Sequence, residues 1–306
     1  MAVEITPAQN GNMGSAVTGF TVAGATAEDY AALRQAVYRD RIIVLKDQQD
    51  ITPEEFVELG RHFGTIVPYY EETYHHPDHP EIFVSSNLSA DGRPLGVPRT
   101  GRFWHADYMF AQEPLSVTVF AQKILPPGRR GTYFIDMVKA FRDLPESLKQ
   151  EARVTRASHS VRRFFKIRPG DVFRPLGDLI REVEKISPPA VHNTVVTHPV
   201  TGEEILYVSE GFTDHLIGAE RDSLLRDLLE ASGQLDETFT DPHIVLHTYE
   251  PGEIVVWDNR ALVHCALHAT DPSAPVMSHR VTTVDGHPFD ANPTPAGRGA
   301  GTGSAK

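Results

Sequence analysis

Hydrophobic residues in the front part of the chain recur at the spacing of helices and of one buried strand. A polar Thr-Ala-Glu-Asp sequence precedes helically spaced apolar residues within 26–39, which predicts an N-capped amphipathic helix. The apolar run RIIVLK at 41–46 predicts a buried strand. A second capping box, Thr-Pro-Glu-Glu at 52–55, predicts another helix, which Gly64 ends. This front part therefore has an αβα character.

The pattern changes to short strands from residue 81 onward. Apolar or alternating segments are separated by turn sequences such as the Pro-Gly pair at 127–128. Helical patterns interrupt these segments near 138–144 and 220–231. Many short strands with Gly/Pro turns predict a mainly β fold, a sandwich or barrel, which the helices would buttress. The predicted strands are 81–86, 102–108, 116–123, 132–135, 191–198, 204–208, 244–249, 253–257 and 279–284.

The segment GRFWHADYMF at 101–110 combines this strand pattern with candidate metal chemistry. Successive side chains of an extended chain point to opposite faces, so His105 and Asp107 would point the same way. Two histidines and one carboxylate bind Fe(II) and leave coordination positions open for oxygen chemistry, which requires a further histidine from elsewhere. The tripeptide alone is a weak signal, because the chain has 15 histidines and an ordinary polar strand end has the same pattern.

A candidate third ligand lies far along the chain. The apolar strand predicted at 253–257 runs into Asp-Asn-Arg at 258–260, and His264 follows after a tight turn. Three motifs occur in a fixed order along the chain: His105-x-Asp107, then Trp-Asp-Asn-Arg with His264, and last His-Arg-Val-Thr at 279–282. In these motifs and their order the chain resembles the Fe(II)/2-oxoglutarate oxygenases of the taurine dioxygenase (TauD/TfdA) family. The resemblance extends from about residue 14 to 289.

This resemblance implies a fold, a metal site and co-substrates. The fold is a double-stranded β-helix, a cupin-like jelly roll, whose mouth holds Fe(II) through His105, Asp107 and His264. The co-substrates are 2-oxoglutarate and O2. Binding of iron by two imidazoles and one carboxylate agrees with the preference of ferrous oxygenase sites.

The family's 2-oxoglutarate site is matched in part. Family members carry a threonine downstream of the aspartate ligand, and Thr132 lies at that position. They usually carry two arginines in the closing segment, of which the first anchors 2-oxoglutarate, but here Val276 replaces the first and only Arg280 remains. His268 is then a candidate for the missing donor and Arg130 is a second. Whether Arg280 serves 2-oxoglutarate or the substrate stays open.

A finer resemblance concerns the isonitrile-forming branch of the family. Residues 67–86, 103–110, 130–136 and 166–171 are similar to enzymes that oxidise and decarboxylate 3-[(carboxymethyl)amino] fatty acids to isonitriles. The resemblance implies the following substrate-binding residues: Tyr69, Tyr70, Tyr74, Tyr108, Lys166 and Arg280. Such an amino-acid-like dianion needs at least two cationic anchors, for which Lys166 and Arg280 are suitable.

Other interpretations of the sequence keep the predicted fold but change the substrate or the function. The chain could hydroxylate another small anion, such as a sulfonate, an aryloxyalkanoate or an amino acid. The β-helix fold could also serve as a catalytically silent binding or metal-storage module, because fold does not fix function. The tyrosines could simply pack a Pro-bounded loop, and Lys166 could be a solvated lysine beside other basic residues.

Composition limits the partners and the cellular setting. The net charge of -12 and the pI near 5.6 argue against nucleic-acid and anionic-membrane surfaces. The single cysteine, Cys265, excludes an internal disulfide, and no long apolar run indicates a membrane span. We expect a cytoplasmic protein with one oxygenase domain over 1–290 and a flexible Gly/Pro/Ala-rich tail over 291–306. A homo-oligomer and other biosynthetic enzymes as partners stay open.

Overall fold

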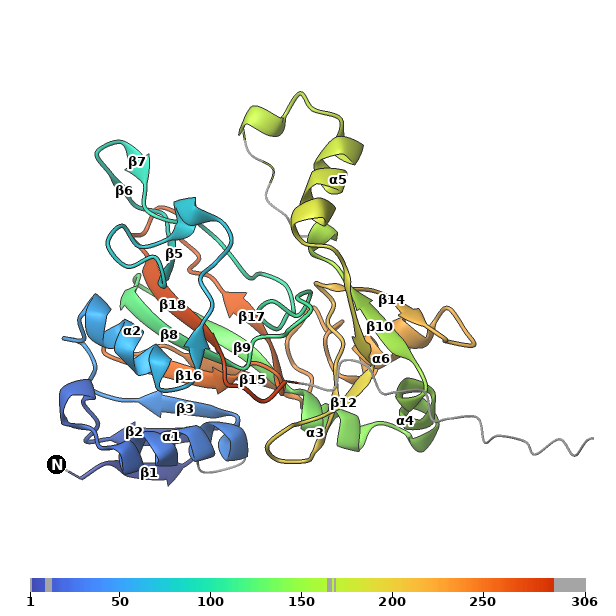
Figure 1. Ribbon diagram of the computed structural model, residues 1–306, viewed down its shortest axis with the longest axis horizontal. Coiled ribbons are helices and arrows are strands. Elements are labelled where there is room, and N and C mark those ends of the chain that lie inside the picture. Colours follow the sequence, from blue (N-terminus) through green and yellow to red (C-terminus); the bar gives the residue numbers. More distant parts are fainter. Residues whose placement is uncertain (1, 9–12, 164–166, 168, 289–306) are drawn as a thin grey trace, which may run out of the picture.

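The computed structural model describes residues 2–8, 13–163, 167 and 169–288, and its centre is a pair of packed sheets (Figure 1). The larger sheet has the strand order β1-β2-β3-β16-β8-β18-β4, and β5 pairs with β18 beside this path. All neighbours are antiparallel except β2 and β3. The strands are β1 (Glu4–Pro7), β2 (Ser15–Thr18), β3 (Ile42–Leu45), β4 (Thr65–Ile66), β5 (Phe83–Ser86), β8 (Val117–Ile124), β16 (Ile254–Asp258) and β18 (Met277–Val284).

A three-stranded sheet faces the larger one. It consists of β15 (Ile244–Thr248), β9 (Gly131–Asp136) and β17 (Leu262–Leu267), in that order. Phe134 and Leu262 of this sheet pack against Val255 and Trp257 of β16 in one buried cluster. Two antiparallel sheets packed in this way form the predicted jelly roll, and the predicted fold class is therefore confirmed.

Helices α1 (Ala27–Asp40) and α2 (Pro53–Arg61) cover the other face of the larger sheet, where their apolar side chains join the strand residues in a second cluster. Both helices begin with the predicted capping boxes. Thr26 Oγ1 accepts the backbone N–H of Asp29 at 3.2 Å, and the Asp29 carboxylate accepts the N–H of Thr26 at 2.8 Å. These reciprocal bonds satisfy amide groups that have no partner inside the helix.

The remaining elements form a peripheral region beside the two sheets. Helix α5 and the segment with η4 before it project away from the sheets toward the upper edge of Figure 1. No helix among the described residues combines the length and the apolarity that crossing a bilayer requires. The helices are α3 (Met137–Asp143), α4 (Glu146–Arg153), α5 (Leu176–Ile186) and α6 (Leu224–Ala231); the short 3-10 turns are η1 (Val22–Gly24), η2 (Glu72–Tyr74), η3 (Val161–Arg163) and η4 (Pro169–Asp171); the strands are β6 (Ser89–Ala90), β7 (Arg93–Pro94), β10 (Arg156–His159), β11 (Ala190–Asn193), β12 (Val195–Thr197), β13 (Glu204–Leu206) and β14 (Thr213–Ile217).

The predicted strand over 102–108 is wrong. Only His105 pairs, as an isolated bridge with His264, and the chain turns from Asp107 onward. Tyr108 has a φ of 55°, a left-handed conformation that a strand cannot accommodate. The alternation of side chains nevertheless led to the correct neighbourhood, because His105 and Asp107 both lie beside His264 of β17.

Other differences concern the limits of elements. The predicted strand 191–198 is divided into β11 and β12, and the helix predicted from 220 begins at Leu224. His264 follows the turn at 259–261, as predicted, and is the third residue of β17. The division into one domain over 1–290 stays a prediction, and residues 291–306 lie outside the described residues.

Candidate active site

The three predicted metal ligands lie side by side although the sequence separates them widely. His105 and His264 form an antiparallel bridge, in which each backbone N–H donates to the carbonyl of the other residue at 3.0 and 2.7 Å. Both Nε2 atoms lie 3.9 Å from Oδ1 of Asp107. One donor atom from each residue lies within 4.8 Å of the others, and all three residues are buried. The structure therefore brings together a 2-His-1-carboxylate set.

Both imidazoles are suited to bind an ion through Nε2. His105 Nδ1 lies 2.8 Å from the carbonyl of Phe103 and donates to it, so that Nε2 of the neutral ring carries a lone pair. Nδ1 of His264 has no hydrogen-bond partner within the described part of the chain. Burial lowers the pKa of both rings, that of His264 well below the usual value. The rings are therefore neutral at physiological pH, which is the form that binds metals.

Asp107 is held by residues from three other segments. Thr118 of β8 donates Oγ1–H to Oδ2 at 2.9 Å, and Arg280 of β18 donates to Oδ1. The side-chain amide of Asn259 bonds both backbone polar groups of Asp107, each at 2.7 Å. Burial alone would raise the pKa of Asp107, but the positive charge of Arg280 opposes it and the pKa lies below the usual value. Asp107 is therefore a carboxylate whose position is fixed.

Two cavities meet at these residues. The larger, of about 700 Å³, is lined by His105 and Asp107, and the smaller, of about 60 Å³, is lined by His105 and His264. Arg280 lines both cavities. His105 and Arg280 therefore border both cavities, whereas Asp107 borders only the larger and His264 only the smaller. Two neutral imidazoles, one carboxylate and open space on both sides fit Fe(II) with free coordination positions.

The residues predicted for 2-oxoglutarate are not all at the same cavity. Arg130 and Thr132 line the smaller one. Arg130 donates one N–H to the carbonyl of Leu267 at 2.6 Å, while its Nε is buried without a hydrogen-bond partner among the described residues. Thr132 Oγ1 lies 2.6 Å from the hydroxyl of Tyr249. Arg130 thus places a guanidinium with an unpartnered N–H beside the smaller cavity.

His268 is not among the residues that line either cavity. Its Nε2 lies 3.0 Å from the carbonyl of Thr100 and donates to it. Burial, followed by the charge of Arg130, lowers the pKa of His268 to about 4. His268 is therefore neutral, and its placement favours Arg130 over His268 as the donor that replaces the missing arginine.

The predicted substrate tyrosines form an aromatic cluster on the wall of the larger cavity. The ring centroid of Tyr69 lies 4.5 Å from that of Tyr70, 5.7 Å from Tyr74 and 5.6 Å from Tyr108. Burial raises the pKa of Tyr69 and Tyr108 far above the usual range, so both hydroxyls keep their protons. The tyrosines therefore pack with one another and line the cavity at once. Lys166 lies outside the described residues.

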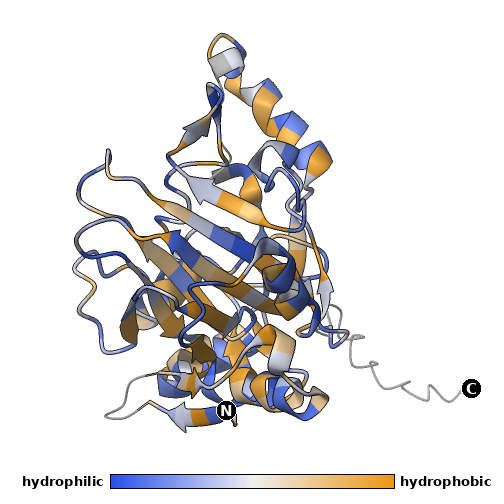
Figure 2. Cartoon of the chain, turned by 90° about the vertical axis from the view of Figure 1, so that its left-hand side faces the viewer, coloured by the Kyte–Doolittle hydropathy of each residue, from blue (hydrophilic) through white to orange (hydrophobic). Residues whose placement is uncertain are grey.

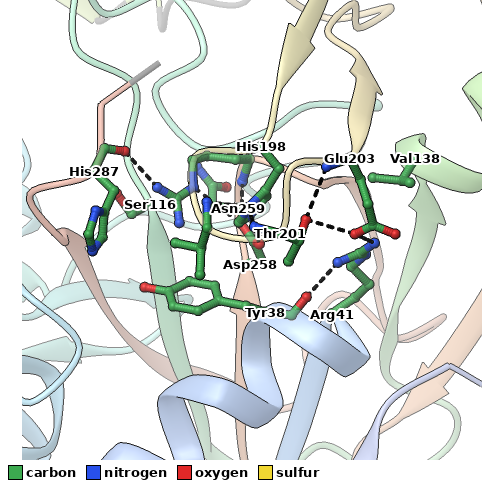
Figure 3. A network of polar contacts seen from close by, with 12 residues as sticks. Tyr38, Arg41, Ser116, Val138, His198, Thr201, Glu203, Asp258, Asn259 and His287 are labelled. Carbon is green, nitrogen blue, oxygen red and sulfur yellow. Dashed lines mark hydrogen bonds and ion pairs between the residues drawn. The ribbon is translucent and has the colours of Figure 1, made fainter. Parts of the chain in front are cut away.

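A buried polar network supports the turn that carries Asn259 (Figure 3). His198 Nδ1 accepts the backbone N–H groups of residues 200–201, both at 3.1 Å, so Nε2 carries the proton and donates to Asp258 Oδ2 at 2.6 Å. Asp258 Oδ1 accepts the backbone N–H of Arg260 at 3.0 Å. His198 and Asp258 are fully buried. The residues on either side of Asn259 are thereby fixed, which orients its amide toward Asp107.

Sequence reasoning missed Asn259, Thr118 and helix α5 as parts of the site. Asn259 lies inside the Trp-Asp-Asn-Arg motif, and a motif that precedes a candidate metal ligand so closely was a usable signal. Thr118 gives no local signal, because its role depends on the pairing of β8 with β18 and β16. Helix α5 was missed because its apolar residues lie next to basic and proline-rich sequence.

Comparison with known proteins agrees with this geometry. Residues 4–282 match the family described as taurine catabolism dioxygenase TauD, TfdA. The chain is 31% identical to pentalenolactone F synthase of Streptomyces arenae, with 92% of this chain and 95% of that protein covered. It is 28% identical to the alpha-ketoglutarate-dependent 2,4-dichlorophenoxyacetate dioxygenase of a Burkholderia species, with 71% of this chain and 73% of that protein covered.

Solved structures show the same fold. A taurine dioxygenase from Burkholderia xenovorans superimposes with a TM-score of 0.71 at 23% identity, covering 95% of each chain. AAD-2 in complex with Mn(II) and N-oxalylglycine superimposes with a TM-score of 0.74 at 23% identity, covering 94% of this chain and 98% of the other.

Proposed function

The chain belongs to the taurine catabolism dioxygenase TauD, TfdA family, and from this premise we propose that it converts a 3-[(carboxymethyl)amino] fatty acid to a 3-isocyano fatty acid. Its class is established more broadly: it is an Fe(II)- and 2-oxoglutarate-dependent dioxygenase that uses O2. The proposal concerns the substrate and the residues that bind it.

Iron is held by His105, Asp107 and His264 in this proposal. When bound, the ion with 2-oxoglutarate supplies oxidising equivalents from O2. Formation of an isonitrile removes CO2 and four hydrogen atoms, two from the CH2 group, one from the amine and one from the carboxylic acid. It therefore consumes two molecules each of O2 and 2-oxoglutarate and releases two molecules each of water and succinate, with one further CO2 from each 2-oxoglutarate. The protein's contribution is to orient the substrate and to exclude water from the site.

The observation that carries the proposal is the position of Arg280 between the two cavities. Its guanidinium donates to Asp107 and lies 4.5 Å from the centre of the Phe83 ring. Substrate in the larger cavity can therefore place a carboxylate against Arg280 while its N-carboxymethyl group lies beside Asp107. The phenol groups of the tyrosine cluster supply hydrogen bonds to the second carboxylate and to the amine.

The smaller cavity is assigned to 2-oxoglutarate. Arg130 has a buried N–H without a partner in the described chain, and a carboxylate is the ligand that would satisfy it. Thr132 lines the same cavity. Lys166 is proposed as the partner of a substrate carboxylate because of the resemblance to the isonitrile-forming branch alone.

A second candidate function is hydroxylation of another small anion. The relatives favour it, since they include 2,4-dichlorophenoxyacetate and sulfonate dioxygenases. The same Arg280 and tyrosine cluster would bind the acid group of such a substrate. A silent binding module is not supported, because the relatives that match most of the chain are named as enzymes.

One experiment separates these functions. Protein loaded with Fe(II) under anaerobic conditions receives 2-oxoglutarate and 3-[(carboxymethyl)amino]butanoate, taurine or 2,4-dichlorophenoxyacetate, and the reaction starts on addition of O2. We expect substrate-dependent succinate and an isonitrile, detected by mass spectrometry and by tetrazine trapping, with the first acid alone. Asp107→Ala serves as the inactive control. Succinate with a hydroxylated product would support the second function, and no substrate-dependent succinate with the first acid would refute the proposal.

A further inference from the structure

We propose that the part of the larger cavity under helix α5 binds a hydrocarbon tail, and that Leu179 and Val183 determine how long a tail the enzyme accepts. The inference rests on the proposed function, because it assumes that the polar head of the substrate lies at Arg280 and Asp107. It adds a specificity-determining surface on α5, a helix that contributes no metal ligand.

A continuous apolar wall leads from the metal ligands to α5. The ring centroid of Phe212 lies 5.9 Å from that of His105 and 4.9 Å from that of Phe110. Phe110, Phe212 and Val161 belong to one buried cluster, and Val183 of α5 packs against that cluster. The apolar residues that line this part of the cavity are Phe110, Val161, Leu179, Val183, Ile186 and Phe212.

Helix α5 presents this wall through a regular stripe. Leu179, Val183 and Ile186 are four and three residues apart, so they lie on one face of the helix. The helix at the top of Figure 2 accordingly carries orange apolar bands between blue polar ones. Leu179 is 6% exposed and Ile186 is 70% exposed. The stripe therefore runs from a buried end to solvent, and a longer tail could reach the open end.

Two arginines beside α5 are already paired. Arg174 donates to Glu182 and, at 3.2 Å, to Asp171, and these three residues line the same part of the cavity. Arg162 donates to Glu184 of α5 at 3.3 Å and also to Asp214 of β14, which ties the helix to the neighbouring sheet. A second anionic group would find its nearest cation engaged here, whereas an alkyl chain needs no such partner.

The size of the cavity also exceeds what a small head group requires. Its volume of about 700 Å³ lies in the range of pockets that enclose ligands of drug size, roughly 300–1,000 Å³. A four-carbon acid would leave the apolar wall in contact with water. Each methylene buried against that wall should strengthen binding about fourfold.

The test is a chain-length series measured by binding and by turnover. We would titrate 3-[(carboxymethyl)amino] acids from butanoate to dodecanoate into Mn(II)-loaded protein with N-oxalylglycine, by calorimetry. Succinate release by the Fe(II) enzyme gives kcat and KM for the same acids. In the parent we expect Kd to fall about fourfold per methylene up to a plateau, with little change in kcat.

Substitutions on α5 test whether Leu179 and Val183 form the surface that binds the tail. Val183→Trp and Leu179→Trp should weaken binding of the longer acids at least tenfold and leave the butanoate unchanged. Val183→Ser adds no bulk but makes the wall more polar, so it should reduce the gain in affinity that each added methylene gives. Val172→Trp is the matched control, because Val172 is 64% exposed and does not line the cavity, and its series should equal that of the parent.

The inference would be overturned by a parent series without length dependence, or by Trp variants that weaken all acids equally. Turnover of the butanoate without any length dependence would refute the tail site and keep the proposed function. If no acid of the series bound to the protein or caused release of succinate, both the tail site and the proposed function would be refuted.

Discussion

The side-chain amide of Asn259 holds the backbone of Asp107 on both sides. Oδ1 accepts the Asp107 N–H and Nδ2 donates to the Asp107 carbonyl, each at 2.7 Å. Nδ2 also donates to the carbonyl of Leu115 at 3.1 Å. The chain turns at Asp107 and no strand partner fixes this residue, so the amide sets the direction of the carboxylate toward the two imidazoles. Asn259 is a positioning residue, because it touches the ligand and not the ion.

Substitution of Asn259 should therefore weaken metal binding. In Asn259→Asp one oxygen can still accept the N–H of Asp107, but nothing donates to the two carbonyls. We expect Mn(II) affinity to fall about 10–100-fold, as when residues that orient metal ligands are removed. The affinity is measured by titration, in which the electron paramagnetic resonance signal gives the concentration of free Mn(II). The control is Asn87→Ala, which removes three amide bonds, those to residues 272–276, from an exposed loop, against the two that Asn259→Asp loses. Equal loss in both variants would contradict the prediction.

Thr118 of β8 should stabilise the carboxylate of Asp107 as a metal ligand. Its hydroxyl donates to Oδ2 of Asp107 at 2.9 Å inside the buried site. Thr118→Val keeps the shape and removes the donor, and loss of a hydrogen bond to a charged group costs about 1.5–3 kcal/mol, or roughly tenfold or more in Mn(II) affinity. Thr118→Ser keeps the donor and should restore most of the affinity. If Ser and Val variants bound Mn(II) equally, the hydroxyl would have no such role.

Arg280 and Arg130 should affect different reactants. Arg280 lies against Asp107 and lines both cavities, whereas Arg130 lines only the smaller one. Arg280→Gln should raise KM for the substrate by about tenfold or more, and Arg130→Gln should do so for 2-oxoglutarate, since each loses a charged hydrogen bond. Succinate release with one reactant saturating separates the two constants. A main effect of Arg280→Gln on 2-oxoglutarate would assign that arginine to the co-substrate instead.

The sequence predicted the three candidate metal ligands, which the structure brings together, because these residues occur in compact motifs. His105-x-Asp107 and the Trp-Asp-Asn-Arg segment before His264 each give a local signal, and the order of the motifs supplies what no single one does. The capping boxes at Thr26 and Thr52 were readable for the same reason, since a cap and its partner are three residues apart.

Long-range pairing explains what the sequence did not reveal. The turn at Asp107 depends on Asn259, which is 152 residues away, and alternation of side chains alone wrongly favoured a strand. The placement of Arg130 in the smaller cavity, and of His268 outside it, follows from the register of β17 with β9. No local pattern encodes either relationship, because both arise when distant strands pair.

The buried pair of His198 and Asp258 should stabilise the fold. His198→Ala leaves Oδ2 of the buried Asp258 carboxylate without its donor, while Oδ1 keeps the N–H of Arg260, and this should cost about 1–3 kcal/mol in the free energy of unfolding. Urea denaturation of the metal-free protein measures this. The matched control is His215→Ala, whose partner is Asp214 and whose side chain is 58% exposed, and its effect should be below about 1 kcal/mol. Similar losses for both variants would contradict the prediction.

His279 should make the stability of the protein fall in mild acid. Burial, followed by the nearby His76 and Lys123, lowers the pKa of this ring to about 3. The unfolded chain takes up this proton below about pH 6.5 and the folded chain does so only near pH 3, so stability is lost as the pH falls between these values.

At pH 5 this loss should amount to about 2 kcal/mol. His279→Leu removes the titrating ring, so the decrease in unfolding free energy from pH 7.5 to 5.0 should shrink by about that amount relative to the parent. Urea denaturation at both pH values, with a chelator present, measures the difference. Histidines that do not contact His279 are common to the two proteins and cancel in the comparison, whereas His76 lies 5.5 Å from its ring and is the one neighbouring histidine whose titration changes with it. An equal decrease in parent and variant would mean that His279 takes up its proton equally well in the folded and the unfolded chain.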